Sequence, residues 1–192
     1  MSIQKFGLAL DWETSGYSVP DYAKEHQGLA FGAIIFDIST LEPVESIYVE
    51  VKFDEKYKWD AGAERIHGLT KEHLAKNGVT QEEAAITLAS LVMKYNGTEK
   101  LIFLGHRPHF DIAFTNQLLA AAELEFQYDP VKIDSAAFGT VMLGVNKSDE
   151  LFSLMGFPPR QDHNALEDIM YTLDSVRLMK EFFIAGVKSS SN

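Results

Sequence analysis

The sequence predicts an α/β sandwich built on one mixed β-sheet. Three segments rich in apolar and β-favouring residues, 6–10, 29–38 and 46–53, lie near the N-terminus and are separated by breaks that contain Gly, Pro and Glu. Such a pattern is typical of strands joined as a meander. Helix-like and strand-like segments then alternate along the rest of the chain. This order favours helices packed on a sheet that has parallel as well as antiparallel strands.

The first helix expected after the meander covers residues 81–95. Alanine, leucine and valine recur there at helical spacing, and Thr80 followed by Glu83 has the spacing of a capping box. Residues 101–104 form a short, wholly apolar run that ends at Gly105, as a central buried strand would.

Pro108 fits the first turn of the next helix. Residues 131–134 are expected to form a fifth strand, followed by helical pieces near 135–143 and 148–154. A final long helix is expected from about 165 to 183.

The chain is expected to form a single domain. It has 192 residues, of which 46% are hydrophobic, and this is enough for one core. No internal repeat appears. We place the domain at residues 1–186 and read the serine-rich end, 187–192, as a flexible tail.

Composition excludes several classes of function. The chain has 17 Lys and Arg against 28 Asp and Glu, a formal net charge of −11, so a broad basic face for a long nucleic acid is not expected. The absence of cysteine removes disulfides, thiolate zinc sites and cysteine nucleophiles. Neither a secretory signal nor a membrane-spanning run is seen, which predicts a soluble, cytoplasmic protein with no membrane partner.

Two carboxylates end the first predicted strand. Asp11 and Glu13 are two residues apart, so both side chains point to one face while Trp12 points to the other. Thr14 and Gly16 follow in a loop where a substrate could approach closely. An ordinary solvated strand end is the alternative interpretation of this pair.

A third carboxylate, Asp111, belongs to the first turns of the helix after Pro108. This position directs it toward the carboxyl end of the 101–104 strand, where open α/β sheets keep their sites. The alternative is that Asp111 only complements the helix dipole.

The segment 163–168 carries a histidine and a fourth acid. Asn164 and Glu167 have the spacing of a capping box, so His163 precedes the last helix and Asp168 lies in its first turns. The apolar stripe of this helix makes Asp168 a costly inward charge unless a cation or donor pairs with it. A lone histidine is more often a surface or structural residue.

Three of these segments together resemble a known family. Residues 11–16 (D-W-E-T-S-G), 106–111 (H-R-P-H-F-D) and 163–168 (H-N-A-L-E-D) are similar, in this order, to the three motifs of the DEDDh, or DnaQ-like, 3′-5′ exonucleases. That family includes ribonuclease T, oligoribonuclease and proofreading subunits of polymerases. Residues 64–74, with I-H-G-L-T, look like a further segment common in it.

The resemblance implies an RNase H-like fold: a five-stranded mixed sheet, its first three strands antiparallel, flanked by helices. It also implies that two Mg²⁺ or Mn²⁺ ions are held by four carboxylates, those of Asp11, Glu13, Asp111 and Asp168. His163 and Glu13 are the catalytic residues that it implies, with His163 taking a proton from water. The chemical sense is clear, because hard divalent ions prefer carboxylate oxygens and clustered carboxylates repel one another without cations.

The activity implied is hydrolysis of the terminal phosphodiester at a 3′ end, with release of nucleoside 5′-monophosphates. Single-stranded DNA or RNA ends, or short oligonucleotides, are the expected partners, because the acidic chain has no long basic track. Family members often pair as homodimers, so a homodimer is possible.

One residue departs from the family pattern. The second motif usually reads H-N-x-x-F-D, and Arg107 stands where the asparagine is expected. Arg107 could alter substrate positioning or add a phosphate contact. Asp37 and Asp134, which end two other predicted strands, have no motif counterpart and are read as structural or solvated.

Further substrate contacts are expected around the first motif. Tyr17 is a candidate for stacking on the terminal base, with Thr14 and Gly16 lining its sugar. His67 and Phe110 are second candidates, although His67 could simply cap a turn and Phe110 could simply pack its helix.

Two other functions remain open at this point. One is a catalytically impaired relative that binds nucleic-acid ends or a protein, which the unusual Arg107 would motivate. The other is an acidic cation binder whose carboxylates only stabilise the fold.

Overall fold

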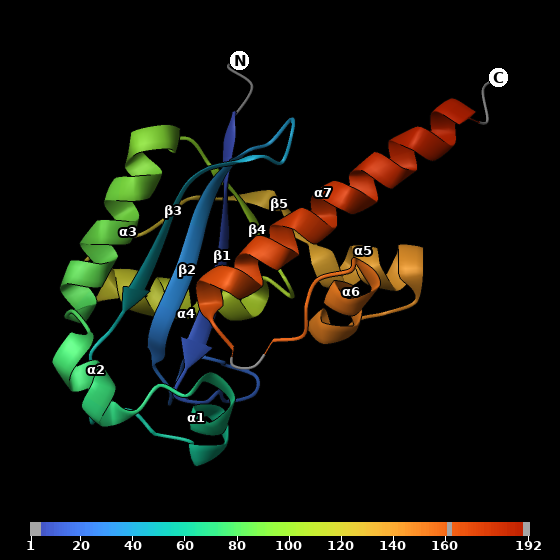
Figure 1. Cartoon of the computed structure of the whole chain (residues 1–192). Coiled ribbons are helices and arrows are strands. Elements are labelled where there is room, and N and C mark those ends of the chain that lie inside the picture. The colour runs from blue at the N-terminus through green and yellow to red at the C-terminus, as the bar shows by residue number, and fades with distance from the viewer. Residues whose placement is uncertain (1–4, 161–162, 190–192) are drawn as a thin grey trace.

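One mixed sheet organises the protein, and the computed structural model describes residues 5–160 and 163–189 of it (Figure 1). The strand order is β3-β2-β1-β4-β5. β2 pairs antiparallel with both β1 and β3, whereas β4 is parallel to β1 and to β5. The strands are β1 (Phe6–Thr14), β2 (Gly28–Asp37), β3 (Pro43–Glu50), β4 (Leu101–Gly105) and β5 (Tyr128–Asp134). This confirms the predicted five-stranded mixed sheet with three antiparallel strands first.

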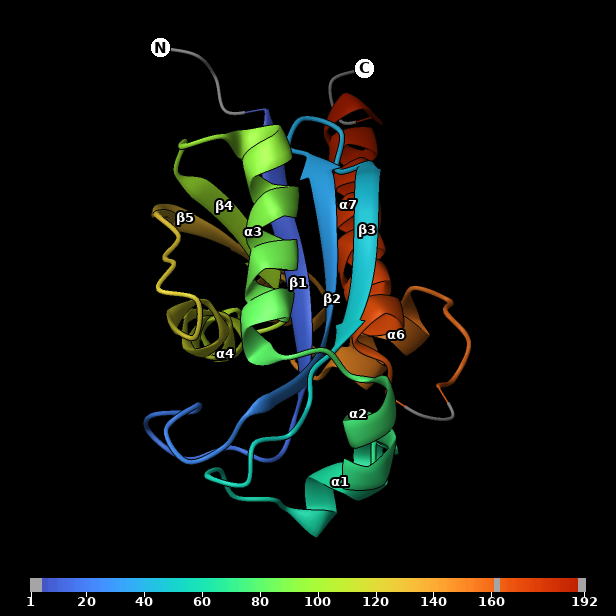
Figure 2. The same cartoon turned by 90° about the vertical axis from the view of Figure 1, so that its left-hand side faces the viewer.

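Helices cover both faces of the sheet. Viewed along its edge, α3 and α4 lie on one side and α7 lies on the other, while α1 and α2 lie beyond the end of the sheet (Figure 2). The helices are α1 (Ala61–His67), α2 (Lys71–Asn77), α3 (Gln81–Asn96), α4 (His109–Ala120), α5 (Ser135–Leu143), α6 (Ser148–Leu154) and α7 (Ala165–Ser189).

Most predicted elements are present, with shifted ends. The capping box of α3 is confirmed, since Thr80 and Glu83 each accept a hydrogen bond from the other's backbone. α5 and α6 match the predicted ranges, whereas β1 continues past its predicted end to Thr14. α7 runs to Ser189, so residues 187–189 belong to a helix and not to the tail that the sequence suggests. Residues 190–192 lie outside the described part of the chain.

α1 and α2 were not predicted as helices. Each has only seven residues, too few for an amphipathic pattern to stand out. Asp60 and Thr70 cap their N-termini by accepting backbone hydrogen bonds.

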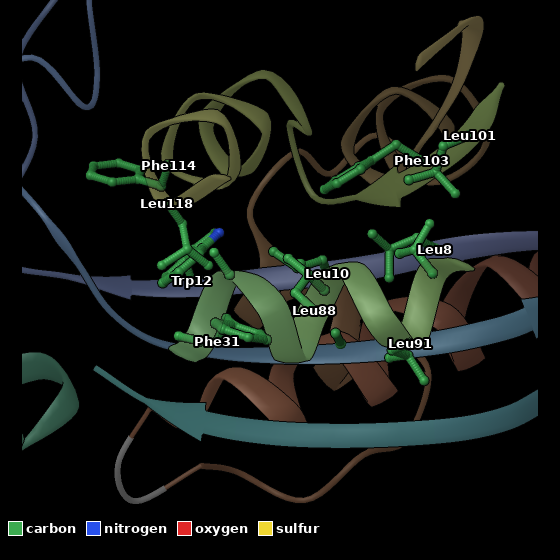
Figure 3. Close-up of a cluster of buried hydrophobic side chains, with 14 of the residues drawn as sticks. Leu8, Leu10, Trp12, Phe31, Leu88, Leu91, Leu101, Phe103, Phe114 and Leu118 are labelled. Atoms are coloured by element: carbon green, nitrogen blue, oxygen red, sulfur yellow. The ribbon is translucent and has the colours of Figure 1, made fainter. Parts of the chain in front are cut away.

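Two apolar cores fill the space between the sheet and the helices on its two faces. The core under α3 and α4 contains Trp12 and Leu10 of β1 together with Phe31 and Phe103 (Figure 3). The core under α6 and α7 contains Ala9 of the same strand. Because side chains alternate along a strand, residues 9, 11 and 13 share the α7 face.

None of the helices in the described ranges is long and apolar enough to span a bilayer.

Candidate active site

The carboxylates of β1 lie where the strand pattern predicts. Asp11 and Glu13 share the face that carries α7, and Trp12 between them points into the opposite core. Glu13 is only 8% exposed. An ordinary solvated strand end does not bury an acid in this way, so the alternative interpretation of this pair is set aside.

Asp168 reaches the same place because the start of α7 rests on β2. A Cβ at Gly32 would come 2.3 Å from Leu166 Cα, so only glycine allows this approach. Asn164 Oδ1 accepts hydrogen bonds from the backbone N–H groups of Leu166 and Glu167 at 3.1 and 3.2 Å. This cap fixes the first turn, and Asp168 is buried within it.

Asp111 arrives from the other side of the sheet, at the start of α4. Its Oδ1 accepts a hydrogen bond from the backbone N–H of Trp12 at 3.2 Å, and the residue is 2% exposed. The contact joins two segments 99 residues apart in the sequence. A role confined to the helix dipole would not require this long-range contact.

His163 precedes α7 and contacts Asp168. Its Nδ1 lies 3.2 Å from Asp168 Oδ2, and its backbone N–H donates to Ile66 O at the end of α1. Among the described residues, Nδ1 of this ring has a polar partner and Nε2 has none. The hydrogen bond with Asp168 raises the pKa of His163, against desolvation and the charge of Arg160.

A single small cavity joins these segments. It measures about 160 Å³, and residues from all three motif segments, 11–16, 106–111 and 163–168, line it. Its lining includes Asp11, Glu13, His106, Arg160, His163 and Asp168. A larger groove of about 670 Å³ between α5 and α7 is lined by apolar side chains and Lys180, without any carboxylate, so it is not the chemical site.

The carboxyl groups are hard to ionise together. Desolvation holds the pKa of Asp11 well above its ordinary value, and the charges of Asp111, Glu13 and Asp168 add to this effect. Burial, followed by the charge of Asp168, raises the pKa of Glu13 to about 7. Burial also raises the pKa of Asp111, although the hydrogen bond from Trp12 opposes it. Such a cluster requires cations to be fully ionised.

The donors present fit divalent metal ions. One ligand atom from each of Glu13, His163 and Asp168 lies within 4.8 Å of the other two. Within the described residues, the buried oxygens Glu13 Oε1 and Asp168 Oδ1 have no hydrogen-bond partner. Unpartnered buried carboxylate oxygens beside other acids are what Mg²⁺ or Mn²⁺ would satisfy.

The chain matches a known protein family over most of its length. The profile of the exonuclease family named for ribonuclease T, described as "Exonuclease", matches residues 8–176. The chain belongs to this DnaQ-like exonuclease family. Metal dependence is typical of that family, and the acidic cluster is where this chain would hold metal. Among curated proteins, none is significantly similar in sequence.

Solved exonucleases share the fold of this family member. Exonuclease I of E. coli with zinc and single-stranded DNA has a TM-score of 0.75 and 21% identity over 93% of this chain and 41% of that chain. The same enzyme with a dT13 oligonucleotide has a TM-score of 0.74 and 22% identity over 92% and 41%. Exonuclease I of Methylocaldum szegediense has a TM-score of 0.72 and 17% identity over 92% and 40%. The chain thus spans about two-fifths of the length of these proteins. They give no support to the homodimer, which stays a prediction.

Arg107 keeps a backbone shape that suits the asparagine of the family motif. Its φ is 63°, in the left-handed region where asparagine is favoured over other side-chain-bearing residues. Its backbone N–H donates to Asp134 Oδ1 at 3.0 Å, and its guanidinium donates to Asn146 O at 3.2 Å. Asp134 also caps α5 through the N–H of Ala136, so its structural reading is confirmed. Arg107 therefore stands in a backbone conformation that asparagine also tolerates, and Asp111 of the same motif is still buried beside Trp12.

Asp37 is structural as well. Its Oδ1 accepts hydrogen bonds from the backbone of Ser39 and Thr40 and from the Ser39 hydroxyl, which builds the turn after β2.

Several predicted substrate residues are used by the chain itself. Gly16 is buried with φ 129°, and a Cβ there would come 2.5 Å from His26 Nδ1, so packing accounts for the glycine. His67 Nε2 donates to Thr14 O at 3.2 Å, and its Nδ1 accepts from the Leu69 N–H at 3.0 Å. Burial lowers the pKa of His67. Thr14 is 7% exposed. These residues hold the rim of the site.

Two aromatic residues lie in a more accessible place. Tyr17 is 63% exposed, and its ring meets the half-buried ring of Phe110 edge to face at 6.1 Å. Phe110 also contacts Tyr22 and Phe114, so it packs its helix as the alternative interpretation held. Tyr17 remains the side chain with a free surface for stacking.

Sequence reasoning missed Arg160 and His106 as members of the site. Arg160 forms ion pairs with Asp168 and Asp149. His106 contacts Ser135 Oγ at 2.9 Å and Asn146 O at 3.1 Å. His106 opens the second motif, which was a usable signal. Arg160 lies in a loop outside the motifs, and no local pattern marks it.

Proposed function

We propose that this protein is a metal-dependent 3′-to-5′ exonuclease that hydrolyses terminal phosphodiesters of single-stranded nucleic acid or short oligonucleotides and releases nucleoside 5′-monophosphates. One observation carries the proposal. Three carboxylates and a histidine line one cavity, and a fourth carboxylate, that of Asp111, accepts a hydrogen bond from the backbone of Trp12 in its wall. Among the described residues, two buried carboxylate oxygens of this cluster have no partner.

Asp11, Glu13, Asp111 and Asp168 are the residues that would hold two Mg²⁺ or Mn²⁺ ions. When bound, such ions activate water and neutralise charge on the phosphate and on the departing oxygen. The chain's own part is to fix these ligands on rigid elements. Glu13 is held in a strand, Asp168 in a capped helix turn and Asp111 by the N–H of Trp12.

His163 would remove the proton from the attacking water. Asp168 orients its ring through Nδ1, which leaves Nε2 as the acceptor. The same hydrogen bond makes the ring a stronger base. Its place in a segment before α7, and not inside the helix, lets the ring adjust to a substrate.

The terminal nucleotide would lie across the rim of the cavity. About 160 Å³ is small beside ligand sites of about 300–1,000 Å³, so the cavity suits a phosphate and ions better than a whole nucleotide. Tyr17 offers an exposed ring for the terminal base, beside Phe110. Arg107 offers an exposed guanidinium to a phosphate on the α4 side.

Product analysis tests the proposal directly. A single-stranded oligonucleotide labelled at its 3′ end should release a labelled nucleoside 5′-monophosphate first, in Mg²⁺ or Mn²⁺ but not in chelator. Asp11→Asn and Asp111→Asn should abolish release. Asp37→Asn is the matched control, because it removes an acid at a strand end within a turn away from the cavity, and it should keep full activity.

Parallel DNA and RNA substrates, from a dinucleotide to a long strand, define the substrate class. A net charge of −11 favours short single-stranded ends. A strong preference for long strands would contradict that part of the proposal. Absence of any nucleotide release with either metal would contradict the whole of it.

A further inference from the structure

Arg160 is a cation held inside the carboxylate cluster. Its side chain is 5% exposed, and its guanidinium pairs with Asp168 Oδ2 through one nitrogen and with Asp149 Oδ1 through another. Its Cζ also lies 5.0 Å from the centre of the Phe152 ring. Three contacts from α6 and α7 thus fix one positive charge at the wall of the cavity.

The guanidinium and a metal ion would act on the same acid. Arg160 uses Oδ2 of Asp168, and His163 shares that oxygen, while Oδ1 is buried without a partner among the described residues. A divalent ion at Oδ1 would therefore sit close to a desolvated guanidinium. Repulsion between two such cations is strong where little water screens them, so the guanidinium should oppose binding of a divalent ion at Oδ1.

Asp149 is the second acid that pairs with the Arg160 guanidinium. It belongs to α6, its side chain is 74% exposed, and it is not among the residues that line the cavity. Asp149 can stay paired with the guanidinium when Asp168 binds a metal ion. Arg160 then does not become an unpaired buried charge.

We propose that Arg160 is a resident counter-cation of the metal site: it positions and neutralises Asp168 when metal is scarce, competes with divalent ions for that carboxylate, and is retained by Asp149 when they bind. This inference rests on the proposed metal site. It makes Arg160 a positioning residue that sets the metal concentration at which the site fills.

Mn²⁺ binding by isothermal titration calorimetry tests the competition. Arg160→Met removes the charge but keeps an apolar stem against Phe152, and it should tighten Mn²⁺ binding by about fivefold or more, within the ordinary range of coupling between two ligands. Arg160→Lys keeps a charge and should bind Mn²⁺ more weakly than Arg160→Met. Arg177→Met is the matched control, because Arg177 also pairs with two acids, Glu42 and Asp174, away from the cavity, and its loss should not change Mn²⁺ affinity.

The Asp149→Asn substitution tests whether Asp149 holds the guanidinium of Arg160. Asp149 is exposed, so the fold should be kept. Without Asp149, release of Asp168 costs more, so Mn²⁺ should bind more weakly than to the wild type. The same substitution in an Arg160→Met background should change affinity less, because no guanidinium is then left to retain.

Thermal unfolding supplies a readout that does not depend on catalysis. In chelator at pH 8, Arg160→Met should unfold at a lower temperature than the wild type, since it leaves Asp168 buried without its cation. Saturating Mn²⁺ should remove most of that difference. An equal loss in chelator and in Mn²⁺, with unchanged or weaker Mn²⁺ affinity, would show that Arg160 only anchors its loop and would overturn the inference. Wild-type protein that binds no Mn²⁺ would overturn the proposed function as well.

Discussion

The first turn of α7 lies directly on Gly32 of β2, where a Cβ would come 2.3 Å from Leu166 Cα and 2.4 Å from its backbone nitrogen. Two residues after Leu166 comes Asp168, and three before it comes His163. The distance between this helix end and the sheet therefore sets the distance between Asp168 and the carboxylates of β1.

Gly32→Ala should push the start of α7 away from the sheet. We expect the free energy of unfolding to fall by about 1–3 kcal/mol, as for other overpacked sites, and nucleotide release to fall much further, because Asp168 moves away from Glu13. Urea unfolding and steady-state kinetics on the same sample separate the two effects. Gly186→Ala is the control on the same helix. Apart from its chain neighbours and the backbone of its own helix, no atom of the described residues lies within 4 Å of a Cβ there, so stability should rise by at most about 1 kcal/mol and activity should not change.

The stability of the protein in chelator should fall as the pH rises from 5 to 8. The folded-state pKa of Glu13, about 7, lies above its ordinary value of 4.5. The folded protein thus binds more protons than the unfolded chain in that window, so the stabilisation is present below pH 4.5 and is lost as the pH rises through 7. Glu13 alone accounts for roughly 3 kcal/mol of this trend. His163, whose pKa is also raised, acts in the same direction.

Chemical unfolding at several pH values measures this dependence. Glu13→Gln should flatten it, since the amide does not titrate. Saturating Mn²⁺ should reverse it, because metal binding requires ionised carboxylates and strengthens as the pH rises. A flat profile for the wild type in chelator would mean that the pKa of Glu13 is not raised in the folded protein.

Arg107→Asn should stabilise the protein. Arginine at φ 63° carries a left-handed strain that asparagine tolerates better, so we expect a gain of up to about 1 kcal/mol in the free energy of unfolding. The backbone hydrogen bond to Asp134 is kept, and the exposed contact with Asn146 is lost. Arg107→Val should destabilise instead, because a β-branched residue tolerates this φ poorly. Equal stabilities for the two variants would contradict this account.

His163→Gln should separate proton transfer from metal binding. We expect kcat to fall about 100- to 10,000-fold, the usual contribution of a general base, while Mn²⁺ still raises the unfolding temperature. If the variant instead loses that thermal shift, His163 is a metal ligand and not the base. Measuring both quantities at saturating Mn²⁺ distinguishes these outcomes, and Asn164→Ser, which keeps a capping oxygen at the next position, controls for damage to the cap of α7.

Much of the site can be predicted from the sequence. Asp11 and Glu13 share a face because strand side chains alternate, and Asp168 lies in the first turns of a helix that Asn164 caps. These features depend on neighbouring residues alone. The succession of strands and helices predicts a mixed sheet, although the short helices α1 and α2 show no periodicity that would predict them.

Other features depend on residues that are distant in the sequence. His67 and Gly16 were assigned to substrate, but His26 and Thr14 already occupy the space and the hydrogen-bonding groups around them. Arg160 carries no local signal, and its importance appears only where α6 and α7 bring Asp149 and Asp168 to its guanidinium.

By itself the sequence determined which side chains of the first strand share a face and which residues cap α3 and α7, since backbone geometry over a few residues decides these properties. The tertiary structure decided that Asp11, Glu13, Asp168, His163 and Arg160 line one cavity with Asp111 beside it, and hence that burial and the charge of Asp168 raise the pKa of Glu13 to about 7. Desolvation and charge interactions depend on distance through space, which the order of residues along the chain does not specify.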